Sequence, residues 1–234
     1  MHVHVSSASS GGHFWKAWQN RVVPRRNRVD PWGDLHAASP RGLLTGNRGC
    51  LVDGEGEIVR HHRGRLWITC VTSFRGWRHP LDAPGTWTPI FFLDDAVALA
   101  AGHRPCGLCR RADHIAYARG VARAEGLEAA PLASELNRRL QRERLATGRG
   151  IDRAGDRLTW TADVANLPDG TVIVREGAAV LLQADRVMAF GFDGWRDPVR
   201  RPTSGAVTVI TPPTSVAALM GGFEPVVHES AKRP

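Results

Sequence analysis

The hydrophobic runs of this chain are short and are separated by glycine and proline, which predicts strands and helices of modest length. The clearest strand signal is Leu66–Thr72, rich in β-branched and aromatic residues, and Ile90–Leu93 is a second apolar run. Residues 14–49 show neither strand nor helix periodicity, so we expect irregular structure there, with a short helix near Phe14–Asn20. The small polar residues within 1–13 predict a disordered tail.

A short helix is predicted over Ala96–Ala101, with Asp94 or Asp95 as its cap and Gly102 as its end. The pattern A-L-x-x-G-x-x-P in this segment returns at Ala218–Pro225, again after an apolar, strand-like run. The repetition predicts the same unit at two places in the fold: a strand, a short helix, a glycine stop and a proline exit.

Two longer helices are expected next. The first runs from about Arg110 to Ala124 and is stopped by Gly126. The second begins at Pro131, and its leucines recur every four residues as a narrow apolar stripe: Leu132, Leu136 and Leu140.

Beyond residue 150 the pattern becomes β-rich. Short β-branched runs are separated by two-residue turn signals at Glu176–Gly177 and Ala184–Asp185, a spacing that predicts consecutive hairpins. The predicted runs are Thr171–Arg175, Ala178–Gln183, Arg186–Phe190 and Ala206–Thr211.

Charge divides the chain at the same place. Residues 1–150 carry 22 basic and 13 acidic side chains, a balance of +9, whereas residues 151–234 carry 9 and 10, a balance of −1. A basic surface attracts and steers polyanions, and this favours a nucleic-acid partner for the first part. The alternative is that the charge only keeps the protein soluble.

Composition excludes several classes of function. The chain is 42% hydrophobic and 23% charged, as in ordinary globular proteins. No apolar run approaches the ~20 residues that cross a bilayer, so we expect no membrane segment and a cytoplasmic protein. Only Lys16 and Lys232 are lysines, both near the ends, so neither a phosphate-binding G-x-x-x-x-G-K-[ST] loop nor a Schiff-base lysine is expected.

The four cysteines are the strongest chemical signal. Cys106 and Cys109 form a C-x-x-C pair directly before a predicted helix, and in an intracellular chain this spacing is typical of a metal site. Zinc takes four soft or borderline ligands, so Cys70 and Cys50 are candidates to complete the site. The histidines that compete for the fourth place are His61, His62, His79 and His103. A dithiol redox centre and buried inert thiols are the alternatives.

A resemblance to a known family appears at these residues. Ile90–Asp113, read as IFFLDDAVALAAGHRPCGLCRRAD, resembles the zinc-binding segment of Ada-type DNA methylphosphotriester repair domains, above all in its R-P-C-x-x-C-R end. In that family two further cysteines on an upstream strand complete the zinc site, and one of them accepts a methyl group. The resemblance implies zinc and DNA, and it makes Cys70 the candidate catalytic thiolate if alkyl transfer occurs.

Arginine and tryptophan are interleaved in the first part of the chain, an arrangement that suits phosphates and unstacked bases. The segment with Arg75, Trp77 and Arg78 is the best local example, and the predicted helices add further arginines. The remaining candidates for nucleic-acid binding are Arg104, Arg110, Arg111, Arg138, Arg139, Arg142 and Arg144.

Taken together, these patterns predict an α+β protein. A basic, zinc-stabilised unit of short strands and helices spans 14–150, and a small β-rich, hairpin-based unit spans 151–234. We expect a zinc-containing nucleic-acid-binding protein, with DNA favoured over RNA and with DNA repair or processing as its setting. Two alternatives stay open: a metal-dependent nuclease or alkyl-transfer enzyme, and a protein-interaction module with structural zinc.

Overall fold

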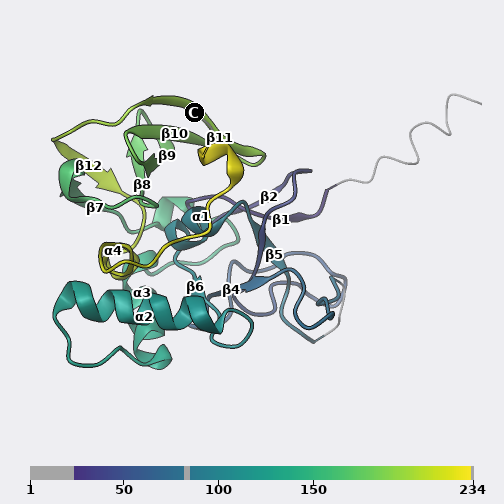
Figure 1. Cartoon of the computed structure of the whole chain (residues 1–234). Coiled ribbons are helices and arrows are strands. Elements are labelled where there is room, and N and C mark those ends of the chain that lie inside the picture. Colours follow the sequence, from purple (N-terminus) through teal and green to yellow (C-terminus); the bar gives the residue numbers. More distant parts are fainter. Residues whose placement is uncertain (1–23, 82–84, 233–234) are drawn as a thin grey trace, which may run out of the picture.

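Two six-stranded β-sheets and four α-helices form the part of the chain that the computed structural model describes, residues 24–81 and 85–232 (Figure 1). The α+β class predicted from the sequence is confirmed. The tail predicted at 1–13 and the helix predicted near Phe14–Asn20 lie outside the described residues.

The first sheet has the strand order β2-β1-β5-β3-β4-β6. Its strands are β1 (Arg26–Val29), β2 (Leu35–Ala37), β3 (Leu44–Asn47), β4 (Ile68–Val71), β5 (Ile90–Phe92) and β6 (Arg104–Pro105). β1 pairs in parallel with β5, and β4 in parallel with β6, whereas the other pairs are antiparallel.

The prediction of irregular structure over 14–49 is wrong for β1, β2 and β3. These strands are only three or four residues long, too short to show a periodicity. In β1 the buried positions are Asn27 and Val29, so one of its two inward side chains is polar and the apolar alternation is hidden. The predicted strands Leu66–Thr72 and Ile90–Leu93 correspond to β4 and β5.

The second sheet is antiparallel throughout, with the order β11-β10-β9-β8-β12-β7. The predicted consecutive hairpins are confirmed, because β8–β9 and β9–β10 are joined by two-residue turns in which Glu176 and Ala184 adopt φ of 52° and 51°. The strands are β7 (Trp160–Asp163), β8 (Val172–Arg175), β9 (Ala178–Gln183), β10 (Arg186–Gly191), β11 (Gly194–Arg200) and β12 (Ala206–Val209).

The helices begin and end close to their predicted bounds. Asp94 caps the first helix by accepting the N–H of Val97 at 3.0 Å, and Gly126 ends the second with a left-handed φ of 65°. The predicted leucine stripe holds for Leu136 and Leu140, which are buried, but Leu132 precedes the third helix and is 74% exposed. The helices are α1 (Asp95–Ala100), α2 (Arg111–Glu125), α3 (Ala133–Arg144) and α4 (Pro213–Met220), with short 3-10 turns η1 (Ala154–Asp156), η2 (Val164–Asn166) and η3 (Glu229–Ala231).

The repeated sequence pattern corresponds to a repeated helix ending. After α1, the N–H of His103 donates to the carbonyl of Ala98 at 2.9 Å, and after α4 the N–H of Phe223 donates to the carbonyl of Ala218 at 2.9 Å. Gly102 and Gly222 occupy the left-handed position in the two endings, with φ of 82° and 88°. A side chain disfavours this conformation, so the glycine of the pattern is required by the turn.

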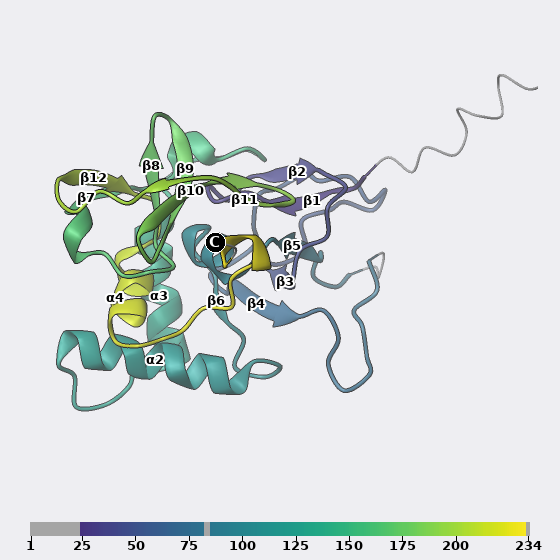
Figure 2. The same ribbon diagram turned by 45° about the horizontal axis from the view of Figure 1, so that its top comes forward.

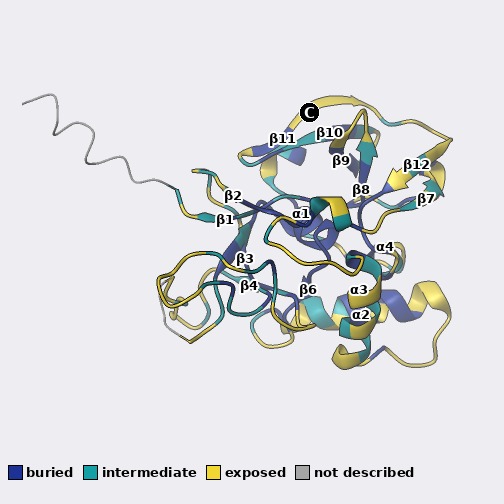
Figure 3. Cartoon of the chain, turned by 180° about the vertical axis from the view of Figure 1, so that it is seen from behind, coloured by how far each residue is buried: buried dark blue, intermediate teal, exposed yellow. Residues whose placement is uncertain are grey.

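α1 lies at the centre of the molecule, and all six of its residues are buried (Figure 3). The largest core cluster contains residues of the first sheet, of α1 and of the second sheet, for example Phe92, Val97 and Leu181. Helices α2, α3 and α4 lie together at one end of the molecule, and the β10–β11 hairpin of the second sheet lies at the other (Figure 2). The predicted boundary at residue 150 therefore separates two sheets that share one core.

Two adjacent aspartates connect α1 to distant parts of the chain. Asp95 forms a two-point ion pair with Arg110, with N–O distances of 2.6 and 2.8 Å, and also accepts the N–H of Val226 at 2.9 Å. The Arg110 guanidinium donates in addition to the Thr69 hydroxyl on β4 at 2.9 Å and to Asp113 at 2.8 Å. The guanidinium and the Asp95 carboxylate are 2% and 1% exposed, so the pair is shielded from water.

Asp94 makes the matching connection to the C-terminal segment. One of its carboxylate oxygens accepts the indole N–H of Trp195 at 2.7 Å and the backbone N–H of His228 at 2.9 Å. Burial raises the pKa of Asp94, and these donors oppose that rise.

We predict that Asp95→Ala destabilises the protein by about 3–5 kcal/mol, because it removes the only buried carboxylate that Arg110 contacts among the described residues and leaves it the more exposed Asp113. Asp113→Ala is the matched control, since it removes the more exposed carboxylate of the same arginine and is expected to cost about 1 kcal/mol or less. Urea unfolding of the two variants measures the difference. Equal losses would show that the buried pair contributes nothing beyond its exposed neighbour.

Candidate metal centre

Three cysteines from separate parts of the first sheet and its following loop meet at one point. The Sγ atoms of Cys70, Cys106 and Cys109 all lie within 4.8 Å of one another. Cys70 lies on β4, and Cys106 directly follows β6, which pairs in parallel with β4. The N–H of Cys106 donates to the carbonyl of Thr69 at 2.9 Å, so the pairing of two strands brings the thiols together.

The turn between Cys106 and Cys109 directs backbone N–H groups at sulfur. Leu108 donates its N–H to Cys106 Sγ at 3.4 Å, the N–H of Cys109 also points at this sulfur, and the N–H of Val71 points at Cys109 Sγ. Such donors stabilise a thiolate, which is the form that binds metals. The exposed residues of the turn are Gly107 and Leu108.

The three cysteine thiols differ in the direction in which their pKa values are shifted. The Cys70 thiol donates to Cys106 and so lowers the pKa of Cys106 to about 5, while the pKa of Cys70 itself is raised. Burial raises the pKa of Cys109. Three thiolates at this spacing repel one another, so a positive ion between them would favour the form in which all three are deprotonated.

A divalent, thiol-seeking ion fits this donor set, since three sulfurs are close together and partly shielded from water. Zinc binds cysteine sulfur in tetrahedral sites, either with a fourth protein ligand or with a position left open. The cluster supplies three of those four positions from the described residues.

Cys50 does not join the cluster, in contrast to its prediction as a metal ligand. Its Sγ instead lies 3.6 Å from the carbonyl of Val52, and the residue lines a separate pocket. The competing histidines are also elsewhere: His61, His62 and His103 contact the indole of Trp67, and His79 stacks on Trp87. The loop that carries Cys50 follows β3 rather than β4, and sequence distance alone could not show this.

His114, which the sequence analysis missed, lies beside the cysteine turn. A Cβ placed on Gly107 would meet the Cδ2 and Nε2 edge of His114 at 3.4 and 3.8 Å. The Arg104 guanidinium points at His114 Nδ1 from 3.4 Å, which makes Nδ1 the acceptor and leaves the proton on Nε2. His114 therefore presents an N–H donor to this turn, and the spacing C-x2-C-x4-H is the signal that could have identified it.

The residues predicted to bind nucleic acid divide into two groups. Arg104, Arg110 and Arg144 are 3–5% exposed and bond within the protein, and Arg139 forms ion pairs with two glutamates. The guanidinium groups of Arg104, Arg110 and Arg144 are therefore engaged inside the fold, whereas the ion pairs of Arg139 lie at the surface. The exposed candidates are Arg75, Trp77, Arg78, Arg111, Arg138 and Arg142.

Comparison with family models, with curated proteins and with solved structures finds no match to this chain. Within residues 24–81 and 85–232, no helix has the length and apolar character needed to cross a membrane.

We predict that the purified protein carries about one zinc ion per chain. Cys106→Ser combined with Cys109→Ser is expected to abolish binding and to unfold the region around β4 and β6, because metal binding and folding are coupled. Elemental analysis after exhaustive dialysis measures the metal, and circular dichroism measures the fold.

Cys50→Ser is the matched control, since it removes a cysteine outside the cluster and should leave the metal content unchanged. Stoichiometric metal in the double variant would contradict the assignment. Loss of metal in the Cys50 variant would return Cys50 to the ligand set.

Proposed function

We propose that the protein binds nucleic acid, with DNA favoured, and that a zinc ion on Cys70, Cys106 and Cys109 stabilises the sheet that carries the binding surface. The observation that carries the proposal is a row of rings that extends from the exposed surface to a pocket. Trp77 contacts His79 with ring centroids 5.4 Å apart, and His79 stacks on Trp87 at 4.0 Å with planes 13° apart.

This row of rings offers a free aromatic face for a base. Trp77 is 58% exposed, unusual for a tryptophan, and it is flanked by the exposed Arg75 and Arg78. An aromatic face between arginines suits an unstacked base and its phosphates. His79 Nε2 lies 3.1 Å from the carbonyl of Trp87, which holds the middle ring in place.

The pocket next to Trp87 continues the same surface. It has a volume of about 820 Å³, and Trp87, Cys50 and an acidic turn at 53–57 are among its lining residues. Its walls also carry four arginines: Arg25, Arg26, Arg60 and Arg63. Because the pocket is lined by both acidic and basic side chains, it favours a nucleic-acid strand held by specific contacts over a polyanion attracted by net charge alone.

The proposed zinc ion supports this surface through β4. Cys70 is the third residue of that strand, and the loop with Trp77 begins directly after it. Phe74 and Trp77 close that loop with reciprocal backbone hydrogen bonds of 2.9 and 3.0 Å. A metal bound at Cys70 would therefore fix the base of the loop that presents Trp77.

We predict that Trp77→Ala weakens binding to single-stranded oligonucleotides by about 5- to 150-fold, which corresponds to the ~1–3 kcal/mol of one stacked base. Duplex DNA should be affected less, because its bases are already stacked. Fluorescence anisotropy with labelled single and double strands measures both. The full chain is used, since residues on both sides of position 150 share one core.

Trp77→Phe is the matched variant, because it keeps an aromatic face and should retain most of the affinity. In the same experiment, log affinity should fall by ~0.7 per contacted phosphate for each unit of log salt on single strands. Absence of binding at low salt, or binding that does not respond to salt, would contradict the proposed function. The protein-interaction alternative would then be preferred.

Alkyl transfer is a second candidate, favoured by the three-sulfur composition of the cluster. Zinc with three thiolates carries a net negative charge, and such thiolates keep their nucleophilicity. In this reaction the Cys70 sulfur would attack the methyl carbon of a methyl phosphotriester. The new S–C bond replaces the C–O bond, and the DNA phosphate leaves as a phosphodiester anion.

Mass spectrometry after incubation with methylated DNA tests this candidate. The expected result is one methyl group on Cys70 and none in the Cys70→Ser variant, while Cys50→Ser still accepts the group. Unmodified cysteines after prolonged incubation would end the hypothesis and leave the nucleic-acid proposal standing.

A further inference from the structure

A cluster of cationic and aromatic side chains surrounds Trp67, which precedes Cys70 by three residues. Trp67 is 1% exposed, and the guanidinium carbons of Arg144 and Arg48 lie 3.8 and 5.2 Å from its ring centroid. The imidazole of His103 lies 5.0 Å from the same ring. We call Arg48, Trp67, His103, Arg144 and Arg157 the interior cationic cluster.

The arginines of this cluster carry charge at neutral pH. Burial lowers the pKa of Arg48, Arg144 and Arg157 to about 9 each, which still leaves all three protonated. His103 is uncharged, because burial and the neighbouring arginines lower its pKa well below its ordinary value. The cluster therefore holds three positive charges in the interior.

Carboxylates compensate the charge of two of these arginines only in part and from a distance: Asp34 and Asp30 act on Arg48, and Asp30 and Glu143 act on Arg157. Among the described residues, Arg48, Arg144 and Arg157 form no ion pair. Asp34 is occupied by the N–H groups of Arg153 and Ala154, at 2.6 and 3.1 Å.

The two other acids near the cluster are also engaged. Glu143 accepts both the N–H and the hydroxyl of Thr214, at 3.0 and 2.7 Å. Asp30 accepts the N–H groups of Gly33 and Asp34 and pairs with His36.

Several polar nitrogens of the cluster have no hydrogen-bond partner in the part of the chain that the structure describes. Arg48 donates one N–H to the carbonyl of Gly33 at 2.7 Å, but its Nε and second terminal nitrogen are unpartnered and buried. Both ring nitrogens of His103 and the Nε of Arg157 are likewise buried and have no hydrogen-bond partner among the described residues. Buried donors at this density require a partner, and an anion would supply both hydrogen-bond acceptors and further negative charge beside the three guanidinium groups.

We propose that the interior cationic cluster binds a small inorganic anion, held by the free N–H groups of Arg48 and the ring N–H of His103. Each donor lies on a fully buried side chain, so the occupant is a compact ion rather than part of a macromolecule. Chloride, nitrate and phosphate share the required chemistry and differ in size and shape.

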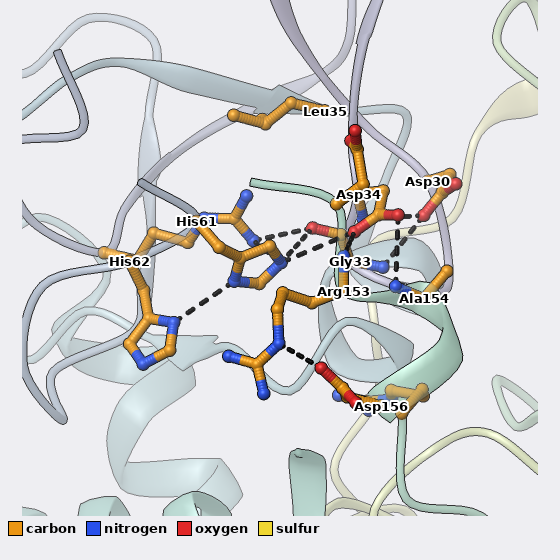
Figure 4. A network of polar contacts seen from close by, with 12 residues as sticks. Asp30, Gly33, Asp34, Leu35, His61, His62, Arg153, Ala154 and Asp156 are labelled. Carbon is orange, nitrogen blue, oxygen red and sulfur yellow. Dashed lines mark hydrogen bonds and ion pairs between the residues drawn. The ribbon is translucent and has the colours of Figure 1, made fainter. Parts of the chain in front are cut away.

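Binding would reinforce a junction between distant segments, shown in Figure 4. Gly33 accepts hydrogen bonds from both Arg48 and His61, and the neighbouring Asp34 holds the start of η1 through Arg153 and Ala154. An anion that holds Arg48 in place would therefore stabilise the 30–34 loop and the hydrogen bonds between Asp34 and the start of η1. The bound ion would act as a structural cofactor of this junction.

The test is thermal unfolding of the full-length protein in gluconate, an ion too large for such a site, followed by titration with chloride, nitrate and phosphate at constant ionic strength. The expected result is a saturating rise in Tm, by about 5–10 °C at 100 times Kd, for at least one of the three. No rise above the gluconate value for any of them overturns the proposal.

Two variants separate this site from general salt effects. Arg48→Met and His103→Phe should remove the saturating rise, whereas Arg138→Met, which changes an exposed arginine, should keep it. If Arg48→Met does not fold, His103→Phe decides alone, since it keeps a ring of similar size. An unchanged rise in His103→Phe would overturn the proposal.

Isothermal titration of the gluconate form then identifies the ion. Tightest binding of chloride indicates a monatomic site, and tightest binding of phosphate indicates an oxyanion site. Neither outcome depends on the metal centre or on nucleic-acid binding.

Discussion

The ion pair between Asp95 and Arg110 is the interaction on which most of the architecture depends. It joins the buried helix α1 to the cysteine turn, and through the Thr69 hydroxyl and the Val226 backbone it also joins β4 and the C-terminal segment. A carboxylate inside a protein is costly unless its oxygens are bonded, and here each oxygen is. The pair therefore fixes the turn that carries Cys106 and Cys109 relative to the strand that carries Cys70.

The chain buries arginine in two different ways. Arg110 has a carboxylate partner and further acceptors for its guanidinium, whereas Arg48, Arg144 and Arg157 rely mainly on backbone carbonyls. Some of those carbonyls belong to the end of α1, where the helix dipole is negative, and this offsets part of the charge. Arg48 donates instead to the carbonyl of Gly33, and its Nε and second terminal nitrogen have no hydrogen-bond partner among the described residues.

Local signals in the sequence predicted the hairpins of the second sheet, the cap of α1 and the ends of α2 correctly, because two-residue turns, aspartate caps and glycine stops act over a few residues. The meeting of Cys70, Cys106 and Cys109 at one point was predictable from residue type and spacing. Cys50 was misassigned, since only strand pairing shows which upstream cysteine lies beside the C-x-x-C pair. The burial of Arg104, Arg110 and Arg144 was not predictable either, because it results from tertiary contacts with residues 15 to 79 positions away.

The link between Asp95 and Val226 also has a consequence for the order of synthesis. Val226 follows Arg110 by 116 residues, so a ribosome that adds ~5–20 residues per second needs about 6–23 s to reach it. During that interval Cys106 and Cys109 have been synthesised, but Asp95 lacks the Val226 backbone to which it bonds in the folded chain. A nascent chain therefore exposes its thiols to the cell's metal ions and oxidants before the final architecture can protect them.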